Sequence, residues 1–194
     1  KQQPRMPAPR LYEQPFYKIG RYSFQFPWVG AQQNNLTAAI NNLRRINARR
    51  ADMQAETKRV ELALAESLRQ RGFAVEVGYR PLATEEDDAG EVDLICHQDG
   101  VLLLLEVKSG YIRSTTNEVW LHRTNTLRKA AWQLRRKQVA VLSALMTDQE
   151  LRARLCYHGQ EPEADMHSWI VDTSIELDGH SVDGFKVVSR EALE

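Results

Sequence analysis

Two apolar stretches separated by a tight turn carry acidic residues where a strand would enter the core. The first covers about residues 90–97 and contains Asp93; the second covers 101–108 and contains Glu106. The Asp-Gly pair between them favours a two-residue hairpin turn, so the two stretches are predicted to be neighbouring strands. A carboxylate at such a position is costly to desolvate unless a positive charge or hydrogen bonds compensate it. A divalent metal ion would provide that compensation.

The spacing within the second stretch adds a lysine to the same face. Glu106 and Lys108 are two residues apart, so on a strand they share a face, and Val107 points to the other. Mg²⁺ binds carboxylate oxygens together with water and substrate phosphate. Asp93 and Glu106 are therefore candidate ligands, the backbone carbonyl of Val107 is a third, and Lys108 would stabilise developing negative charge. The alternative is a simple ion pair at the sheet edge, which adds little stability when exposed.

Bulk properties narrow the class of protein. The 194 residues suffice for one domain and an arm, and the formal net charge is zero, so nucleic-acid binding would need local basic patches. Cys96 and Cys156 are far apart and are predicted to be reduced, buried thiols of a cytoplasmic protein. No signal peptide or apolar stretch of about 18 residues is present, so we expect no membrane association. The chain starts without Met and ends in a short Ser-capped helix at 189–194, which suggests a piece of a longer protein.

The N-terminal part is predicted to be separate from the main domain. Residues 1–35 hold five of the seven prolines and many aromatic residues, which indicates an extended arm. Its aromatic side chains would pack against protein or, alternatively, stack on bases. Residues 35–71 have helical periodicity, as one long helix or two, ending before Gly72. We expect an arm and helix over 1–50 and a domain over 51–194.

The pattern beyond this helix predicts a mixed α/β domain. A strand is expected at 73–80, an acidic loop at 85–88, a hairpin at 110–122, a long helix at 125–146, a capping box at 147–150, and late strands at 169–171 and 185–188. Together with the two acidic strands, this order favours a mixed sheet flanked by helices, the three-layer α/β class.

The acidic strands also resemble a known family. The string Gly90-Glu-Val-Asp-Leu-Ile followed by Glu106-Val-Lys108 is similar to the motif of the PD-(D/E)xK nuclease superfamily, in its Holliday-junction-resolvase-like branch. The resemblance covers about residues 56–173 and implies a restriction-endonuclease-like α-β-β-β-α-β core. It also implies Mg²⁺-dependent hydrolysis of phosphodiester bonds, with Mn²⁺ as a substitute. Val92 stands where the motif's name has proline.

The resemblance assigns roles to individual residues. It makes Asp93 and Glu106 metal ligands and Lys108 the residue that assists the nucleophilic water. It places a further acid on the helix before the first strand, where Glu61 would complete the metal site directly or through water. Glu56 and Glu66 are the alternatives on that helix.

Some branches of the superfamily carry a glutamine on the helix after the third strand. Gln133 is the residue that matches this position. There it would touch the metal-bound water or a phosphate. The alternative is an ordinary polar helix residue, since Gln is a common helix former.

A basic segment follows the acidic strands. No Asp or Glu occurs over 119–147, a range that contains Arg123, Arg128, Lys129, Arg135, Arg136 and Lys137. Such segregation is typical of a phosphate-facing surface, although a solvated helix face is the alternative. Arg113 and His122, in the expected hairpin, would approach the substrate. No base-reading motif is evident, so contacts to the nucleic-acid backbone are expected.

These observations predict an endonuclease domain of a larger protein, with DNA favoured over RNA as the substrate. The alternative is an inactive module of the same fold that binds nucleic acid or assembles with other proteins. Whether two copies pair into a homodimer stays open.

Overall fold

The computed structural model describes residues 16–25, 50–82, 88–110, 113, 116–160, 162 and 166–193. The chain divides into two units, residues 1–50 and 51–194. In the first unit, strands β1 (Phe16–Ile19) and β2 (Tyr22–Gln25) form an antiparallel hairpin closed by a two-residue turn. Gly20 begins this turn with a φ of +62°, a conformation that favours glycine. The other residues of the expected arm, and 35–49 of the expected helix, lie outside the described ranges.

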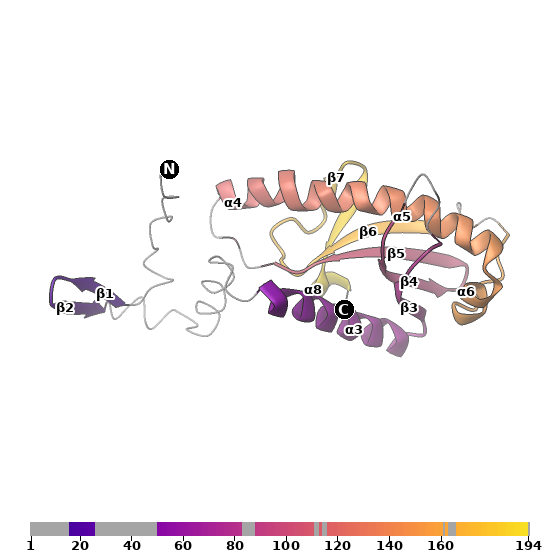
Figure 1. The fold of residues 1–194 in the computed structure, drawn as a ribbon, viewed down its shortest axis with the longest axis horizontal. Helices are drawn as coiled ribbons and strands as arrows, with labels where there is room; N and C mark the ends of the chain where they lie inside the picture. Colours follow the sequence, from indigo (N-terminus) through magenta and orange to yellow (C-terminus); the bar gives the residue numbers. More distant parts are fainter. Residues whose placement is uncertain are drawn as a thin grey trace. The chain divides into compact units, whose positions relative to one another are not determined.

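The second unit is a mixed α/β fold built on a six-stranded sheet (Figure 1). Its strands are β3 (Ala74–Tyr79), β4 (Val92–Gln98), β5 (Val101–Lys108), β6 (Met166–Asp172), β7 (Ser181–Val182) and β8 (Phe185–Ser189). Its helices are α3 (Arg50–Gln70), α4 (Thr116–Leu121), the π-helical segment η1 (His122–Leu127), α5 (Arg128–Thr147), α6 (Gln149–Arg154) and α8 (Arg190–Leu193). The sheet order is β3-β4-β5-β6-β8-β7; β5, β6 and β8 are parallel to one another, and the other pairs are antiparallel.

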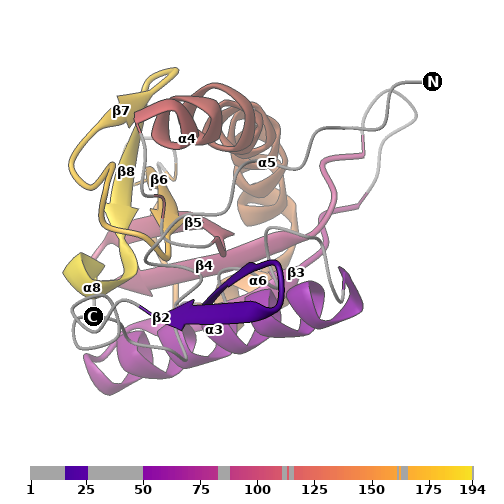
Figure 2. The same cartoon turned by 90° about the vertical axis from the view of Figure 1, so that its left-hand side faces the viewer.

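Helices cover both faces of this sheet (Figure 2). On one face, Leu64 and Leu68 of α3 belong to the same apolar cluster as Leu105 of β5. On the other face, Leu134 of α5 clusters with Leu104 of the same strand. β5 is therefore buried on both sides, which explains its unbroken apolar run. The predicted α/β class, a mixed sheet flanked by helices, is confirmed.

Most predicted elements occur where the pattern placed them. The strands expected at 73–80, 90–97, 101–108, 169–171 and 185–188 correspond to β3, β4, β5, β6 and β8. Asp99 and Gly100 make the turn between β4 and β5 with φ angles of 50° and 82°. Gly72, at a φ of +94°, follows the end of α3, where the N–H of Phe73 caps the carbonyl of Leu68.

Helix replaces the second half of the hairpin expected at 110–122, whereas 111, 112, 114 and 115 lie outside the described ranges. Residues from Thr116 onward form one helical run through α4, η1 and α5. Thr and Asn, which suggested a turn, also begin helices, and Val119 packs against the core from this helix. Within η1 the N–H of Arg128 bonds to the carbonyl of Arg123, five residues back, as in a π-helix.

The short helix after α5 has a different cap from the one expected. Its N-cap is Asp148, whose side chain accepts the N–H of Leu151 at 2.9 Å and the hydroxyl of Tyr79 at 3.1 Å. Thr147 belongs to α5 and donates its hydroxyl to the carbonyl of Ser143. A carboxylate at the N-cap also interacts favourably with the helix dipole, which accounts for the shift by one residue.

Two further expectations concern the thiols and the membrane. Cys96 is buried as expected, whereas Cys156, which follows α6 with a φ of 51°, is exposed. None of the described helices is both long enough and apolar enough to span a lipid bilayer.

Candidate functional site

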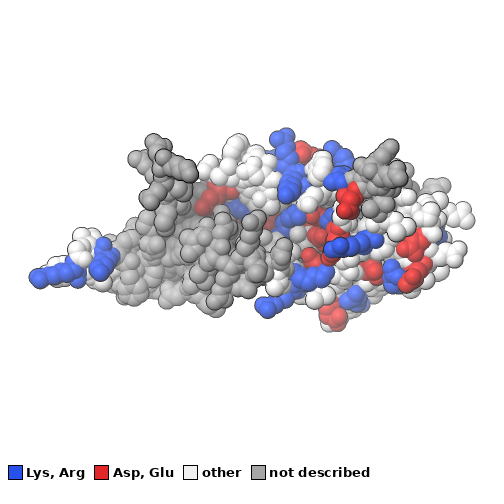
Figure 3. Space-filling view, in the orientation of Figure 1, with Lys and Arg blue, Asp and Glu red and all other residues white. Residues whose placement is uncertain are grey.

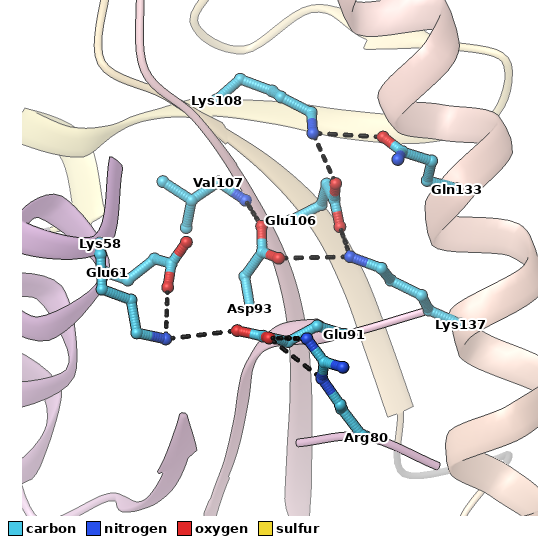
Figure 4. A network of polar contacts seen from close by, with 10 residues as sticks. All are labelled: Lys58, Glu61, Arg80, Glu91, Asp93, Glu106, Val107, Lys108, Gln133 and Lys137. Atoms are coloured by element: carbon cyan, nitrogen blue, oxygen red, sulfur yellow. Dashed lines mark hydrogen bonds and ion pairs between the residues drawn. The ribbon is translucent and has the colours of Figure 1, made fainter. Parts of the chain in front are cut away.

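The two acidic strands separate at Asp93 and Glu106. Regular pairing of β4 with β5 ends at Leu94 and Leu105, so these acids are the next residues on each strand. Asp93 Oδ2 accepts the N–H of Val107 at 2.7 Å (Figure 4). A carboxylate thus replaces a main-chain carbonyl at the end of the ladder and ties the strands together.

Glu106 and Lys108 lie on the face of the sheet covered by α5, as their spacing predicts. Lys108 Nζ donates to Glu106 Oε1 at 2.6 Å and to Gln133 Oε1 at 3.2 Å (Figure 4). Glu106 is only 1% exposed. Gln133 therefore joins the site from α5, and it does so by holding the lysine.

Lys137 also belongs to this site. It is buried, and its Nζ lies 3.2 Å from Asp93 Oδ1 and bonds to Glu106 Oε2. The basic composition of the segment predicts an exposed side chain at this position, and this prediction is wrong. The sequence does hold a signal for its position, because Lys137 follows Gln133 by four residues and falls in the buried stripe that includes Val141.

The charges of the site balance within the protein. Burial, and next the negative charge of Glu106, raise the pKa of Asp93 to about 6. Burial by itself would lower the pKa of Lys137, but Asp93 and Glu106 outweigh it and the pKa is raised. Two acids and two lysines thus compensate one another in a largely dehydrated space.

Glu61 lies in a neighbouring network. It is buried on α3 and pairs with Lys58 Nζ at 3.0 Å, and Lys58 also contacts Glu91 at 3.4 Å. Glu91 is held in turn by Arg80 at 3.0 Å. Gly78, with a φ of +70°, faces this network, and a Cβ there would lie 3.0 Å from Glu91 and 3.1 Å from Lys58. A side chain at Gly78 would disturb the ion pairs.

The three predicted acids do not form one cluster. Within the part of the chain that the structure describes, no three His, Cys, Asp or Glu side chains gather as a metal site would require. Glu61 therefore does not join Asp93 and Glu106 in such a group, and its role in the metal site, directly or through water, stays a prediction. Glu66, an alternative on the same helix, is exposed and accepts a hydrogen bond from Gln70, so it does not join Asp93 and Glu106 either.

The residues that remain fit a hard divalent cation. Mg²⁺ often takes only one or two protein carboxylates, and Asp93 and Glu106 already share a cation, the ammonium of Lys137. The N–H and C=O of one strand residue point to the same side. The N–H of Val107 faces Asp93 on β4, so the carbonyl of Val107 is also directed toward β4. This direction fits the role of metal ligand that is predicted for the carbonyl.

Arg113 and His122 form a separate buried cluster. His122 Nε2 lies 2.7 Å from Asp172, and Arg113 Nη1 lies 2.5 Å from Ser174 and 3.6 Å from Glu176. Both side chains were expected to approach the substrate, whereas in the structure both are buried against Asp172. Asp172 pairs in register with Lys108, so the cluster adjoins the site at the ends of β5 and β6.

The basic surface of the long helix is smaller than the sequence suggested. Arg123, Arg128, Lys129 and Arg135 are exposed. Arg128 pairs with Asp183, Arg135 donates to the Asp183 carbonyl, and Arg136 donates to the Asp88 carbonyl. On the face shown in Figure 3, basic and acidic side chains are interspersed. No continuous basic patch therefore occupies that view of the described residues.

The chain matches no protein-family model, and no curated protein shows significant sequence similarity to it. The arrangement of the side chains therefore supplies the basis for a functional assignment. Four of the predicted catalytic residues, Asp93, Glu106, Lys108 and Gln133, meet in one network, and Lys137 completes it.

Proposed function

We propose that residues 51–194 form a metal-dependent endonuclease domain with a restriction-endonuclease-like core. Its substrate is nucleic acid, with DNA favoured over RNA. The observation that carries the proposal is the convergence of Asp93, Glu106 and Lys108 at the point where β4 and β5 separate. The element order α3-β3-β4-β5-α5-β6 supports it, because it follows the α-β-β-β-α-β core that the sequence resemblance implies.

Each residue of the network has a role in such a reaction. Asp93 and Glu106 would hold Mg²⁺ or Mn²⁺, which when bound supplies positive charge that offsets the charge on the reacting phosphate. Lys108 is fixed by Glu106 and Gln133, so its ammonium is directed before substrate arrives. A charge fixed in advance stabilises the transition state without reorganisation during the reaction.

Exposed basic residues on the same helical run would contact the phosphate backbone. Arg123 and Lys129 are exposed and precede Gln133 and Lys137, which face the site. Contacts of this kind position the nucleic acid without reading its sequence.

Cleavage of supercoiled plasmid DNA in the presence of Mg²⁺ or Mn²⁺ tests the proposal. We expect nicking by the wild-type chain and a loss of about 100-fold or more in Asp93→Ala and in Lys108→Ala. Lys186→Ala, a change at an exposed lysine of β8, serves as the control and should retain activity. Activity that survives both Asp93→Ala and Lys108→Ala would overturn the assignment.

A second candidate function is an inactive nucleic-acid-binding or assembly module. The observation in its favour is that Lys137 already contacts both acids and, together with Lys108, balances their charge, so the network is satisfied without a metal. Titration calorimetry separates the two functions. DNA binding without any binding of Mg²⁺ or Mn²⁺ at millimolar concentrations favours the inactive module.

A further inference from the structure

The oxygens of Asp93 and Glu106 are divided among different partners. Asp93 Oδ2 is held by the main-chain N–H of Val107, and Glu106 Oε1 is held by Lys108. One oxygen of each acid is left, and both bond to the same group, the Nζ of Lys137. A cation chelated by both acids would use this pair of oxygens (Figure 4).

Lys137 reaches this position from outside the strand pair. It lies on α5, whereas the two acids lie on β4 and β5, and its side chain is 5% exposed. Its charge is therefore enclosed with the two carboxylates, where like charges repel strongly because little water screens them. A divalent ion and the ammonium cannot occupy the space between the same two oxygens.

We propose that Lys137 is a displaceable internal cation that occupies the metal position of the metal-free protein and leaves when a divalent ion binds. This inference rests on the proposed function of the site. The four-carbon stem of lysine is flexible, and rotation of this stem moves the ammonium without moving α5. The affinity for metal is then set by competition, and the wild-type chain binds metal more weakly than its two acids alone would.

Removal of the internal cation tests the competition. In calorimetric titrations of the full chain with MnCl₂ and MgCl₂, Lys137→Met should bind metal about tenfold tighter or more, because the competing charge is gone. Lys186→Met, which removes an exposed lysine from β8, should bind as the wild type does. Lys137→Arg, which keeps the charge, should not gain affinity.

Thermal unfolding gives a readout that does not depend on catalysis. Without metal, Lys137→Met should unfold at a lower temperature than the wild type, since two buried carboxylates lose their partner. Added Mn²⁺ should raise its unfolding temperature by more than it raises that of the wild type. If Lys137→Met does not fold, Lys137→Gln, which keeps an N–H donor without the charge, is measured in its place, and the same direction is expected.

The outcomes separate this inference from the proposed function. Equal or weaker metal affinity in both uncharged variants overturns the role of Lys137 and leaves the function standing. Absence of metal binding in the wild type and in these variants overturns both. Tight binding confined to the uncharged variants supports the inference and favours the inactive module for the wild-type chain.

Discussion

The Nε2 of His122 lies 2.7 Å from Oδ2 of Asp172, and both side chains are buried. The same carboxylate accepts the hydroxyl of Ser174 at 3.0 Å and lies 3.6 Å from Arg113. It is the acceptor that holds the end of β6 to η1. Asp172→Asn leaves Arg113 and His122 without this charge, and we expect a loss of about 3–5 kcal/mol in the free energy of unfolding.

Urea denaturation followed by circular dichroism measures this loss. Glu176→Gln is the matched control, because Glu176 faces the same arginine but is more exposed, at 18% against 0% for Asp172. Its cost should be smaller. Equal costs for the two variants would contradict the central role of Asp172.

The pKa of Asp93 predicts how the stability of the metal-free protein changes with pH. Burial and the charge of Glu106 raise this pKa from 3.8 to about 6. Between these two values Asp93 binds more protons in the folded protein than in the unfolded chain, so its contribution to stability is fully present below the lower value and is lost as pH rises through the window. The decrease amounts to about 3 kcal/mol at most. Urea denaturation of the wild type and of Asp93→Asn at pH values between these two limits tests this prediction. If the difference in the free energy of unfolding between the two proteins does not change with pH, the prediction is wrong.

Gln133 should matter for cleavage through its contact with Lys108. Its Oε1 accepts from Lys108 Nζ at 3.2 Å. Gln133→Leu removes the acceptor and leaves the lysine less well oriented, so we expect about a tenfold decrease in kcat with little change in DNA affinity. Gln138→Leu on the same helix is the control. A fall in DNA affinity at unchanged kcat would assign Gln133 to substrate binding instead.

Arg123 and Lys129 should contribute to binding of nucleic acid. Both are exposed, and within the described part of the chain neither has an ion-pair partner. The double change to alanine should weaken DNA binding and reduce the slope of log K against log salt by about 2. Arg154→Ala is the control, since Arg154 is paired with Glu76 and Glu150. An unchanged salt slope in the double variant would exclude these residues from the interface.

Asp148 rather than Thr147 should be the N-cap that stabilises α6. Asp148→Ala loses the bonds to the N–H of Leu151 and to the hydroxyl of Tyr79. The expected cost is about 1–2 kcal/mol in the free energy of unfolding. Thr147→Ala should cost less, because its hydroxyl only bonds within α5. If chemical denaturation shows a larger loss of stability for Thr147→Ala than for Asp148→Ala, Thr147 is the N-cap, as the sequence predicts.

The sheet and the strand acids were predictable from local sequence. Asp93, Glu106 and Lys108 stand at the ends of apolar runs, and both the period of two and the Asp-Gly turn are short-range signals. The hairpin expected at 110–122 failed because Thr and Asn favour turns and helix starts alike, and only packing of the helix on the sheet distinguishes them.

The lysine of the site was harder to assign. Lys137 lies among basic residues in the sequence, and this composition predicts an exposed side chain. In the structure, Lys137 belongs to the buried stripe of α5. Glu61 presents the opposite case. The sequence resemblance predicts that Glu61 is a metal ligand, but in the structure Glu61 forms an ion pair with Lys58, one helical turn away. The helical period could indicate that Lys137 is buried, but its long-range contacts with Asp93 and Glu106 are not revealed by a single sequence.

The π-helical segment η1 lies between two halves of one helical run. Each residue of an α-helix turns the chain by about 100°. A π-helical turn holds about one residue more than an α-helical turn, because its hydrogen bonds reach the fifth residue back. Loss of one residue from η1, with the run continuing as α-helix, should therefore keep His122 directed at Asp172 and Gln133 at Lys108. Loss of one residue from the regular helix between Arg128 and Gln133 would instead turn the two side chains by about 100° relative to each other, and one of the two contacts would break. A deletion should thus be tolerated within η1 and harmful in the regular helix that follows it.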